Sequence, residues 1–182
     1  KHSLLNIRAE EAGRHKAMTD EEIQRVRQAI PHLQDRNERL YMGLLAYTGM
    51  RPEEMLALRV GAFVPAGEGG DAQVRIVAAQ RAGRIENYTK SDSSMRTVPL
   101  DRYTASVVEA WIEEKRRSLD EMGLVLRSST PLLGETGNPW SYNSFKKRWN
   151  AFVRKAGFAG TRPYALRHTF ATINLAPGGG RT

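Results

Sequence analysis

Apolar residues recur with two different periods along this chain. Up to Leu58 they fall three or four positions apart, as in Ile23, Val26 and Ile30, which is the spacing of one face of an α-helix. Short alternating runs with glycine-rich breaks then take over, and the helical spacing returns after Asp101. This pattern predicts helices over residues 20–30, 35–47, 52–58, 101–118, 141–156 and 163–175, and strands over 73–79, 84–90 and 95–100.

Capping residues mark the predicted boundaries. Thr19 is followed three residues later by Glu22, which is a capping box, and Gly49 is placed to end the second helix in a left-handed conformation. Pro52 suits the first turn of the third helix. Residues 91–94 are the expected turn between the last two strands. The predicted fold is α+β, mostly α-helical, with a small three-stranded antiparallel sheet inserted after the third helix.

The length of 182 residues predicts one domain. We expect residues 1–17 to be a polar lead-in, residues 18–176 to form the domain, and residues 177–182 to form a flexible, glycine-rich tail. Because the chain opens at Lys1 in a charged segment, we expect it to be an excised domain.

The amino-acid composition excludes several kinds of functional site. The sequence has no cysteine, which removes disulfides, zinc–thiolate sites and cysteine nucleophiles, and its four histidines form no close pair. We therefore expect no metal and no cofactor. No apolar run approaches the roughly 18 residues of a membrane span, and no signal-peptide pattern is present. The expected location is the cytoplasm, in association with the nucleoid.

The net charge of +8 lies entirely at the C-terminal end. No acidic residue follows Glu135, whereas basic residues interleave with aromatic ones, as expected for a polyphosphate partner. A pair of helices with an aromatic core and a solvated basic face is the alternative, and an anionic membrane surface is a weaker one. The candidate DNA-binding residues are Lys146, Lys147, Arg148, Arg154, Lys155 and Arg162.

Three segments carry candidate chemistry: TGMRPEEMLALR at 48–59, TKSDSSMRTVPL at 89–100 and RPYALRHTFAT at 162–172. In this order they resemble the catalytic domain of the tyrosine recombinases, the phage integrase family. The resemblance covers about residues 17–175, and the third segment is its most specific part. It implies site-specific DNA recombination or integration, in which a DNA strand is cleaved and rejoined through a covalent phosphotyrosine without metal or high-energy cofactor.

Two arginines fit that chemistry on physical grounds as well. Charge builds on the non-bridging phosphate oxygens during attack, and guanidinium groups stabilise it because they are permanently charged and donate bidentately. The resemblance implies that Arg51 and Arg167 have this catalytic role and that Glu54 orients Arg51. A plain surface ion pair between Arg51 and Glu54 is the alternative.

The remaining site residues follow the resemblance less closely. Lys90 matches the lysine that protonates the departing 5′-oxygen, although a solvated turn lysine would look the same. Tyr164 occupies the usual histidine position three residues before Arg167. A tyrosine there can donate a hydrogen bond, but with a pKa near 10 it is a poor base. We expect His168 to support the structure by bonding to the backbone.

The family's Leu-Gly-His box and the nucleophilic tyrosine after it have no match before residue 182. We therefore expect this chain to be a truncated form, monomeric alone, that binds double-stranded DNA weakly and does not cleave it. The complete protein would assemble with other recombinase protomers as a tetramer on DNA. The alternatives are a noncatalytic DNA-binding regulator that retains the scaffold and a helical RNA-binding module.

Overall fold

The computed structural model describes residues 18–68, 70–88, 94–134, 138–158 and 160–175, and the side chains only as far as residue 170. The predicted lead-in, the predicted tail and Lys90 lie outside these ranges. The α-helices are α2 (Asp20–Ala29), α3 (Arg36–Thr48), α4 (Pro52–Leu56), α5 (Arg102–Glu121), α6 (Tyr142–Lys155) and α7 (Tyr164–Leu175). Two 3₁₀ turns are η1 (Ile30–His32) and η2 (Val60–Ala62). The strands are β1 (Phe63–Val64), β2 (Gln73–Ile76), β3 (Ala78–Arg81), β4 (Arg84–Asn87) and β5 (Arg96–Pro99).

The helix boundaries follow the capping signals. Thr19 and Glu22 form the predicted capping box at the start of α2, each side chain bonding to the other residue's backbone N–H. The Asp35 and Asp101 side chains cap α3 and α5. Gly49 ends α3 with φ of 61°, a left-handed conformation that favours glycine. The predicted mostly helical α+β fold is confirmed.

The sheet differs from the prediction in its pairing. The single strand predicted over residues 73–79 is two strands, β2 and β3, with the exposed Val77 between them. β5 pairs with β2 in the three-stranded sheet β1-β2-β5, whereas β4 pairs with β3 in a separate hairpin. The predicted turn lies largely outside the described residues, and the strands on either side of it, β4 and β5, belong to different sheets. The break falls at Val77, where the chain changes partners: β2 pairs with β1 and β5, and β3 pairs with β4.

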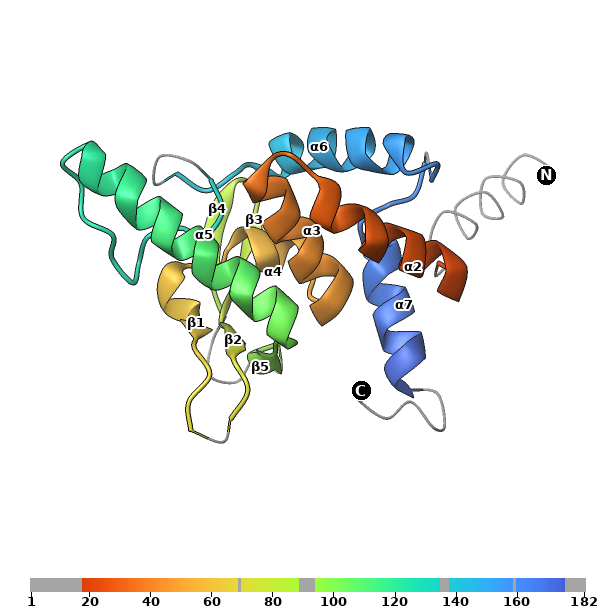
Figure 1. Cartoon of the computed structure of the whole chain (residues 1–182), viewed down its shortest axis with the longest axis horizontal. Helices are drawn as coiled ribbons and strands as arrows, with labels where there is room; N and C mark the ends of the chain where they lie inside the picture. The colour runs from red at the N-terminus through yellow and green to blue at the C-terminus, as the bar shows by residue number, and fades with distance from the viewer. Residues whose placement is uncertain (1–17, 69, 89–93, 135–137, 159, 176–182) are drawn as a thin grey trace.

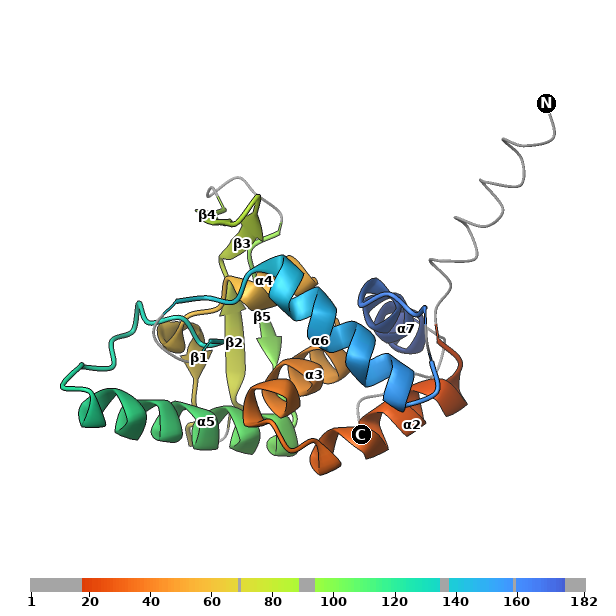
Figure 2. The same ribbon diagram turned by 90° about the horizontal axis from the view of Figure 1, so that it is seen from above.

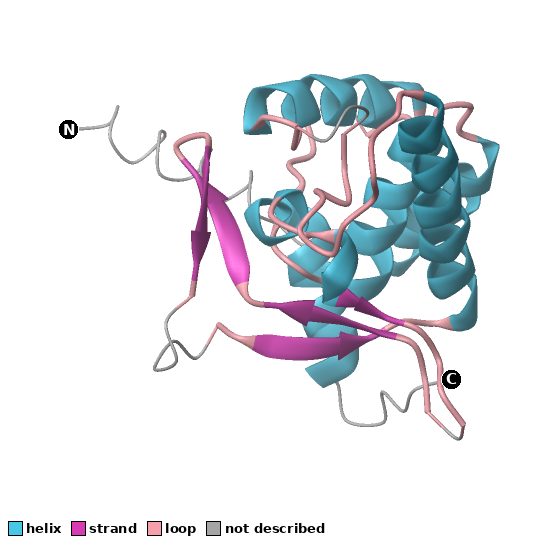
Figure 3. Cartoon of the chain, turned by 90° about the vertical axis from the view of Figure 1, so that its left-hand side faces the viewer, coloured by secondary structure: helices cyan, strands magenta, loops and turns pink. Residues whose placement is uncertain are grey.

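Helices and strands occupy different sides of the molecule. In Figure 3 the helices pack together on one side, and the β3–β4 hairpin rises steeply from the end of the three-stranded sheet on the other. Figure 2 shows α5 and the β3–β4 hairpin at opposite edges, with α3 and α4 between them. The core between these layers is centred on α3, where Leu40, Tyr41, Leu44 and Leu45 are fully or almost fully buried.

The C-terminal helices close the other end of the core. α6 lies across one edge, and α7 packs against α3 (Figure 1). Phe145, Trp149 and Phe152 turn the inner face of α6 into the core. The main-chain N–H of Met18 donates to the Thr169 hydroxyl over 2.8 Å, which ties the start of α2 to α7. Within the described ranges no helix is both long and apolar enough to cross a membrane.

Candidate active site

The buried carboxylate of Glu54 is the centre of a charged cluster. Its side chain has no exposed surface, and it accepts hydrogen bonds from two arginines. Arg51 donates to it from its main-chain N–H and from its side-chain Nη1, both over 2.8 Å. Arg96 donates from Nη1 over 2.9 Å and from Nη2 over 2.8 Å, one to each carboxylate oxygen. The Tyr88 hydroxyl lies 3.3 Å from Oε1.

The local fold explains this arrangement. Because α3 ends at the left-handed Gly49 and α4 begins at Pro52, the chain turns sharply around Arg51. Glu54 stands in the first turn of α4, from which its carboxylate reaches back to the Arg51 main chain. Arg96 enters from the first position of β5, where it pairs with Ile76 of β2.

The hydrogen bonds keep Glu54 ionised. Burial alone would raise the pKa of this carboxyl, but the hydrogen bonds from Arg96 and Arg51 outweigh burial and lower the pKa from 4.5 to about 2. The hydrogen bond with Glu54 also raises the pKa of Arg51. Glu54 is therefore a fixed anion near neutral pH, suited to orienting guanidinium groups and unsuited to accepting a proton.

Arg167 joins this cluster from α7. Its Nη1 donates to the main-chain oxygen of Gly49 over 2.7 Å, two residues before Arg51. Burial lowers the pKa of Arg167, and the nearby charges of Arg51 and Arg96 lower it further. The structure thus brings together Arg51, Glu54 and Arg167, which come from two distant sequence segments. Arg51 and Arg96 bond to the Glu54 carboxylate, and Arg167 lies near enough to interact electrostatically with all three. Among these four residues the positive charges exceed the negative charge by two.

Tyr164 lies on the border of the cluster. Its hydroxyl donates to the Glu53 carboxylate over 2.6 Å. Burial and this hydrogen bond raise the pKa of Tyr164 above its usual value of 10, so the hydroxyl keeps its proton near neutral pH. Tyr164 can therefore act as a hydrogen-bonding group but not as a base. His168, the next predicted supporting residue, is exposed on α7.

The predicted DNA-binding residues separate into two groups. Five of them are exposed on α6 and on the loop before α7: Lys146, Lys147, Arg154, Lys155 and Arg162. Arg148 is different, because its Nη1 donates to Asp35 over 2.7 Å and to Glu38 over 3.3 Å, and its guanidinium lies 4.5 Å from the centre of the Trp140 ring. Arg148 therefore joins α6 to α3, and its contact with DNA stays a prediction.

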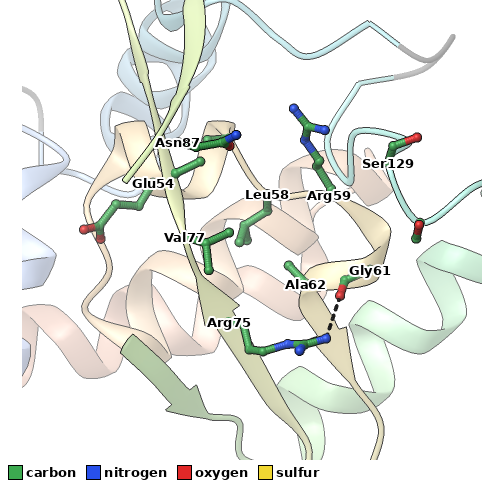
Figure 4. Close-up of a pocket in the computed structure, with 12 residues that line it drawn as sticks. Glu54, Leu58, Arg59, Gly61, Ala62, Arg75, Val77, Asn87 and Ser129 are labelled. Atoms are coloured by element: carbon green, nitrogen blue, oxygen red, sulfur yellow. Dashed lines mark hydrogen bonds between the residues drawn. The ribbon is translucent and has the colours of Figure 1, made fainter. Parts of the chain in front are cut away.

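A hollow lies between α6 and the start of α7. It has a volume of about 440 Å³, and Lys146, Asn150, Arg162 and Tyr164 are among the residues that line it. A second cavity, of about 400 Å³, lies between α4, the β2–β3 bend and Ser128–Ser129. In Figure 4 the Glu54 carboxylate extends away from Arg59 and Ser129 in that second cavity, so the arginine cluster faces elsewhere.

Sequence reasoning missed three contributors to the site. Arg96 and Tyr88 contact Glu54, and Glu53 accepts the Tyr164 hydrogen bond. Arg96 stands inside the second of the three segments, and its position at the start of a strand was the available signal. Lys90 lies outside the described residues, and its role stays a prediction. The described part of the chain holds no group of three or more His, Asp or Glu residues suited to a metal ion.

The fold is that of the catalytic domains of tyrosine recombinases. XerA recombinase matches with a TM-score of 0.63 at 17% identity, over 90% of this chain and 52% of that one. XerH site-specific recombinase bound to difH substrate in a pre-cleavage complex matches with a TM-score of 0.63 at 22% identity, over 87% of this chain and 42% of that one. The Tn1549 transposon integrase in complex with transposon right end DNA matches with a TM-score of 0.66 at 17% identity, over 90% of this chain and 54% of that one.

The phage integrase family model matches residues 16–179, and the chain belongs to that family. It spans about half the length of the solved structures it resembles. A sequence search of curated proteins finds no match.

Proposed function

We propose that this domain binds and activates a DNA phosphodiester for site-specific recombination or integration. The observation that carries the proposal is the closeness of Arg51 and Arg167: Arg167 bonds to the main-chain oxygen of Gly49, two residues before Arg51, and the two guanidiniums interact electrostatically. Two guanidiniums fixed in a partly buried site are suited to the charge that develops on non-bridging phosphate oxygens. The family and the DNA-bound state of XerH and of the Tn1549 integrase in their solved structures support the same activity.

The reaction that fits is an exchange at phosphorus. A tyrosine oxygen gives up its proton to water and forms a bond to phosphorus while the bond to the 5′-oxygen breaks, and the departing oxygen takes up a proton, which we assign to Lys90. Arg51 and Arg167 hold the two non-bridging oxygens during this step. Tyr164 lies next to them as a hydrogen-bonding group. Attack by the freed 5′-hydroxyl of another strand reverses the step and rejoins the DNA.

The attacking tyrosine is, in this proposal, none of the tyrosines in the sequence. Tyr88 and Tyr164 lie near the arginines, but each hydroxyl donates a hydrogen bond to a glutamate carboxylate. The raised pKa of Tyr164 opposes formation of the phenolate. Tyr41 is fully buried. We propose that the nucleophile belongs to a segment beyond residue 182. We also propose that the complete protein acts as a tetramer on DNA, in the cytoplasm and in association with the nucleoid.

The exposed basic residues of α6 would hold the duplex next to this site. Lys146, Lys147, Arg154 and Lys155 project from one helix, and Arg162 borders the hollow that leads to Tyr164. Contacts of this kind neutralise phosphates and give affinity that falls with salt. They carry no sequence information of their own.

A crystal of the chain soaked with orthovanadate tests the proposal. Orthovanadate is a tetrahedral oxyanion like phosphate, so we expect it to bind between Arg51 and Arg167. Crystals of the Arg51→Ala variant should lose the anion, and those of an Arg75→Ala control should keep it. Absence of vanadate from the arginine cluster in the unaltered chain would contradict the proposal and favour a noncatalytic DNA-binding protein.

A further inference from the structure

We infer that Arg96 is a positioning residue that neutralises Glu54, so that Arg51 keeps its positive charge for the phosphate. This inference rests on the proposed function and gives the site a third functional arginine. Arg96 reaches Glu54 from a separate element, β5, 42 residues later in the sequence.

The two arginines bind Glu54 in different ways. Arg96 uses both of its terminal nitrogens and contacts both carboxylate oxygens, which is the bidentate geometry that gives the strongest arginine–carboxylate pairs. Arg51 uses one side-chain nitrogen, Nη1, on one oxygen, and its second contact comes from the main chain. The Arg51 guanidinium therefore has donors that point away from Glu54, and its side chain is 40% exposed.

Charge explains why the second arginine is needed. A buried carboxylate requires a compensating cation, and Arg51 alone would be cancelled by Glu54. With Arg96 present, the cluster has the three positive charges of Arg51, Arg96 and Arg167 against the one negative charge of Glu54, and two positive charges remain for a phosphate. Without Arg96 only one would remain. The glutamate thus orients Arg51, while Arg96 prevents the glutamate from neutralising it.

The position of Arg96 in the sheet makes it a rigid support. Its backbone is paired in register with Ile76 of the central strand β2. Its Nη1 also donates to the main-chain oxygen of Ser94 over 3.1 Å, which fixes the guanidinium at a second point. Its side chain is 31% exposed, so the group lies at the rim of the site and not deep in the core.

An NMR titration of the full chain with inorganic phosphate tests this role. The side-chain Nε–H signals of Arg51 and Arg167 report phosphate binding at the cluster. The variants are Arg96→Met, the double variant Arg96→Met with Glu54→Gln, and Arg75→Met as a control on the neighbouring strand. By charge count the double variant regains the two excess positive charges of the unaltered chain, whereas Arg96→Met has one.

We expect Arg96→Met to weaken phosphate binding about tenfold, as one lost charge near the ligand would. The double variant should regain most of that affinity, and Arg75→Met should bind as the unaltered chain does. Recovery on removing the carboxylate is the readout that a merely structural role for Arg96 would not produce. Equal affinity in Arg96→Met and the unaltered chain, or no recovery in the double variant, overturns the inference.

Two further outcomes are decisive. If the unaltered chain shows no phosphate-dependent shift at Arg51 and Arg167, the proposed function fails, and the inference fails with it. If Arg96→Met does not fold, Arg96→Lys replaces it, because lysine keeps the positive charge but lacks the two parallel N–H donors of the guanidinium. We then expect phosphate affinity within about threefold of the unaltered chain, since the neutralising charge remains. A tenfold loss in folded Arg96→Lys would show that neutralisation of Glu54 is not the role of Arg96.

Discussion

The guanidinium of Arg167 donates to the main-chain oxygen of Gly49, a residue 118 positions earlier in the chain. This hydrogen bond joins α7 to the end of α3, two residues before Arg51. The Phe170 side chain, one turn further along α7, packs against the same glycine. The two candidate phosphate-binding arginines are therefore held by one helix–helix contact, and damage to that contact should affect both.

Replacing Gly49 with alanine should strongly destabilise the domain. The φ of 61° disfavours an L-residue, and a Cβ at this position would lie 2.4 Å from the Phe170 ring. We expect a loss of about 2–4 kcal/mol in the free energy of unfolding, measured by urea denaturation. The cost of holding alanine in a left-handed backbone conformation adds to the cost of its methyl group clashing with Phe170. Weaker phosphate binding should accompany it, since Arg167 shares the contact.

Gly43→Ala is the matched control for that experiment. Gly43 is also buried in α3, but a Cβ there meets nothing within 4 Å. Alanine should stabilise the helix by up to about 1 kcal/mol. If Gly49→Ala unfolds at the same urea concentration as the unaltered chain, the close contact between α3 and α7 is not present in solution.

The charged cluster should make stability depend on pH at the acid end. The pKa of Glu54 lies at about 2 in the folded chain against 4.5 for an unperturbed carboxyl. Its contribution, on the order of 3 kcal/mol, is therefore fully present above pH 4.5 and is lost as the pH falls towards 2. Glu54→Gln should lower the free energy of unfolding by about this amount at pH 7 and by progressively less below pH 4.5.

Urea denaturation at pH 7, 4 and 3 measures the difference between the two proteins. Glu68→Gln, at an exposed turn, serves as the control and should follow the unaltered chain at every pH. A constant difference between Glu54→Gln and the unaltered chain from pH 7 to pH 3 would contradict the low pKa of Glu54.

Sequence reasoning predicted the elements whose signals are local. The capping box at Thr19, the left-handed Gly49 and the N-cap at Asp101 each involve residues within a few positions of one another, so their side chains and backbone angles decide the outcome nearby. The partner of β5 is a different kind of question. β5 follows β4 in the sequence but pairs with β2, and only the packing of the whole sheet on the helices decides that choice.

The same division applies to the site. Arg51 and Glu54 are three residues apart, and a motif contains both. Arg96 was missed because its contact with Glu54 spans 42 positions and depends on the register between β5 and β2. Arg148 was assigned to DNA from its basic surroundings, but Asp35 and Glu38 lie far away in the sequence and meet it only in the folded chain.

The hydrogen bond between Tyr164 and Glu53 should contribute to stability below the pKa of tyrosine. Tyr164→Phe removes the donor and leaves the carboxylate with one partner fewer, so we expect a loss of about 1–2 kcal/mol at pH 7. Because folding raises the pKa of Tyr164, this contribution is present below pH 10 and fades as the pH rises through the higher folded value. The difference between Tyr164→Phe and the unaltered chain should therefore shrink above pH 10.

Urea denaturation at pH 7, 9 and 11 follows this difference, and Tyr103→Phe, on the exposed side of α5, is the matched control. Equal stability of Tyr164→Phe and the unaltered chain at pH 7 would show that the hydrogen bond to Glu53 contributes nothing.

Two adjacent basic residues of α6 should behave differently toward DNA. Lys147 is exposed, whereas Arg148 is held by Asp35, Glu38 and Trp140. If Lys147 contacts a phosphate, Lys147→Ala should reduce the slope of log affinity against log salt concentration by about 0.9 and leave stability unchanged. Arg148→Ala should leave that slope unchanged and lower the free energy of unfolding by about 1 kcal/mol, a modest loss because both partners of the pair are partly exposed.

Fluorescence anisotropy of a labelled DNA duplex, titrated at several salt concentrations, measures the slope, and urea denaturation measures the stability of each variant. The two substitutions sit side by side on one helix, so a general effect on α6 would move both readouts together. A smaller salt slope in Arg148→Ala would mean that Arg148 leaves its carboxylates for the DNA. In that case α6 would be released from α3 when DNA binds, and the Arg148 pair would be a contact that binding breaks.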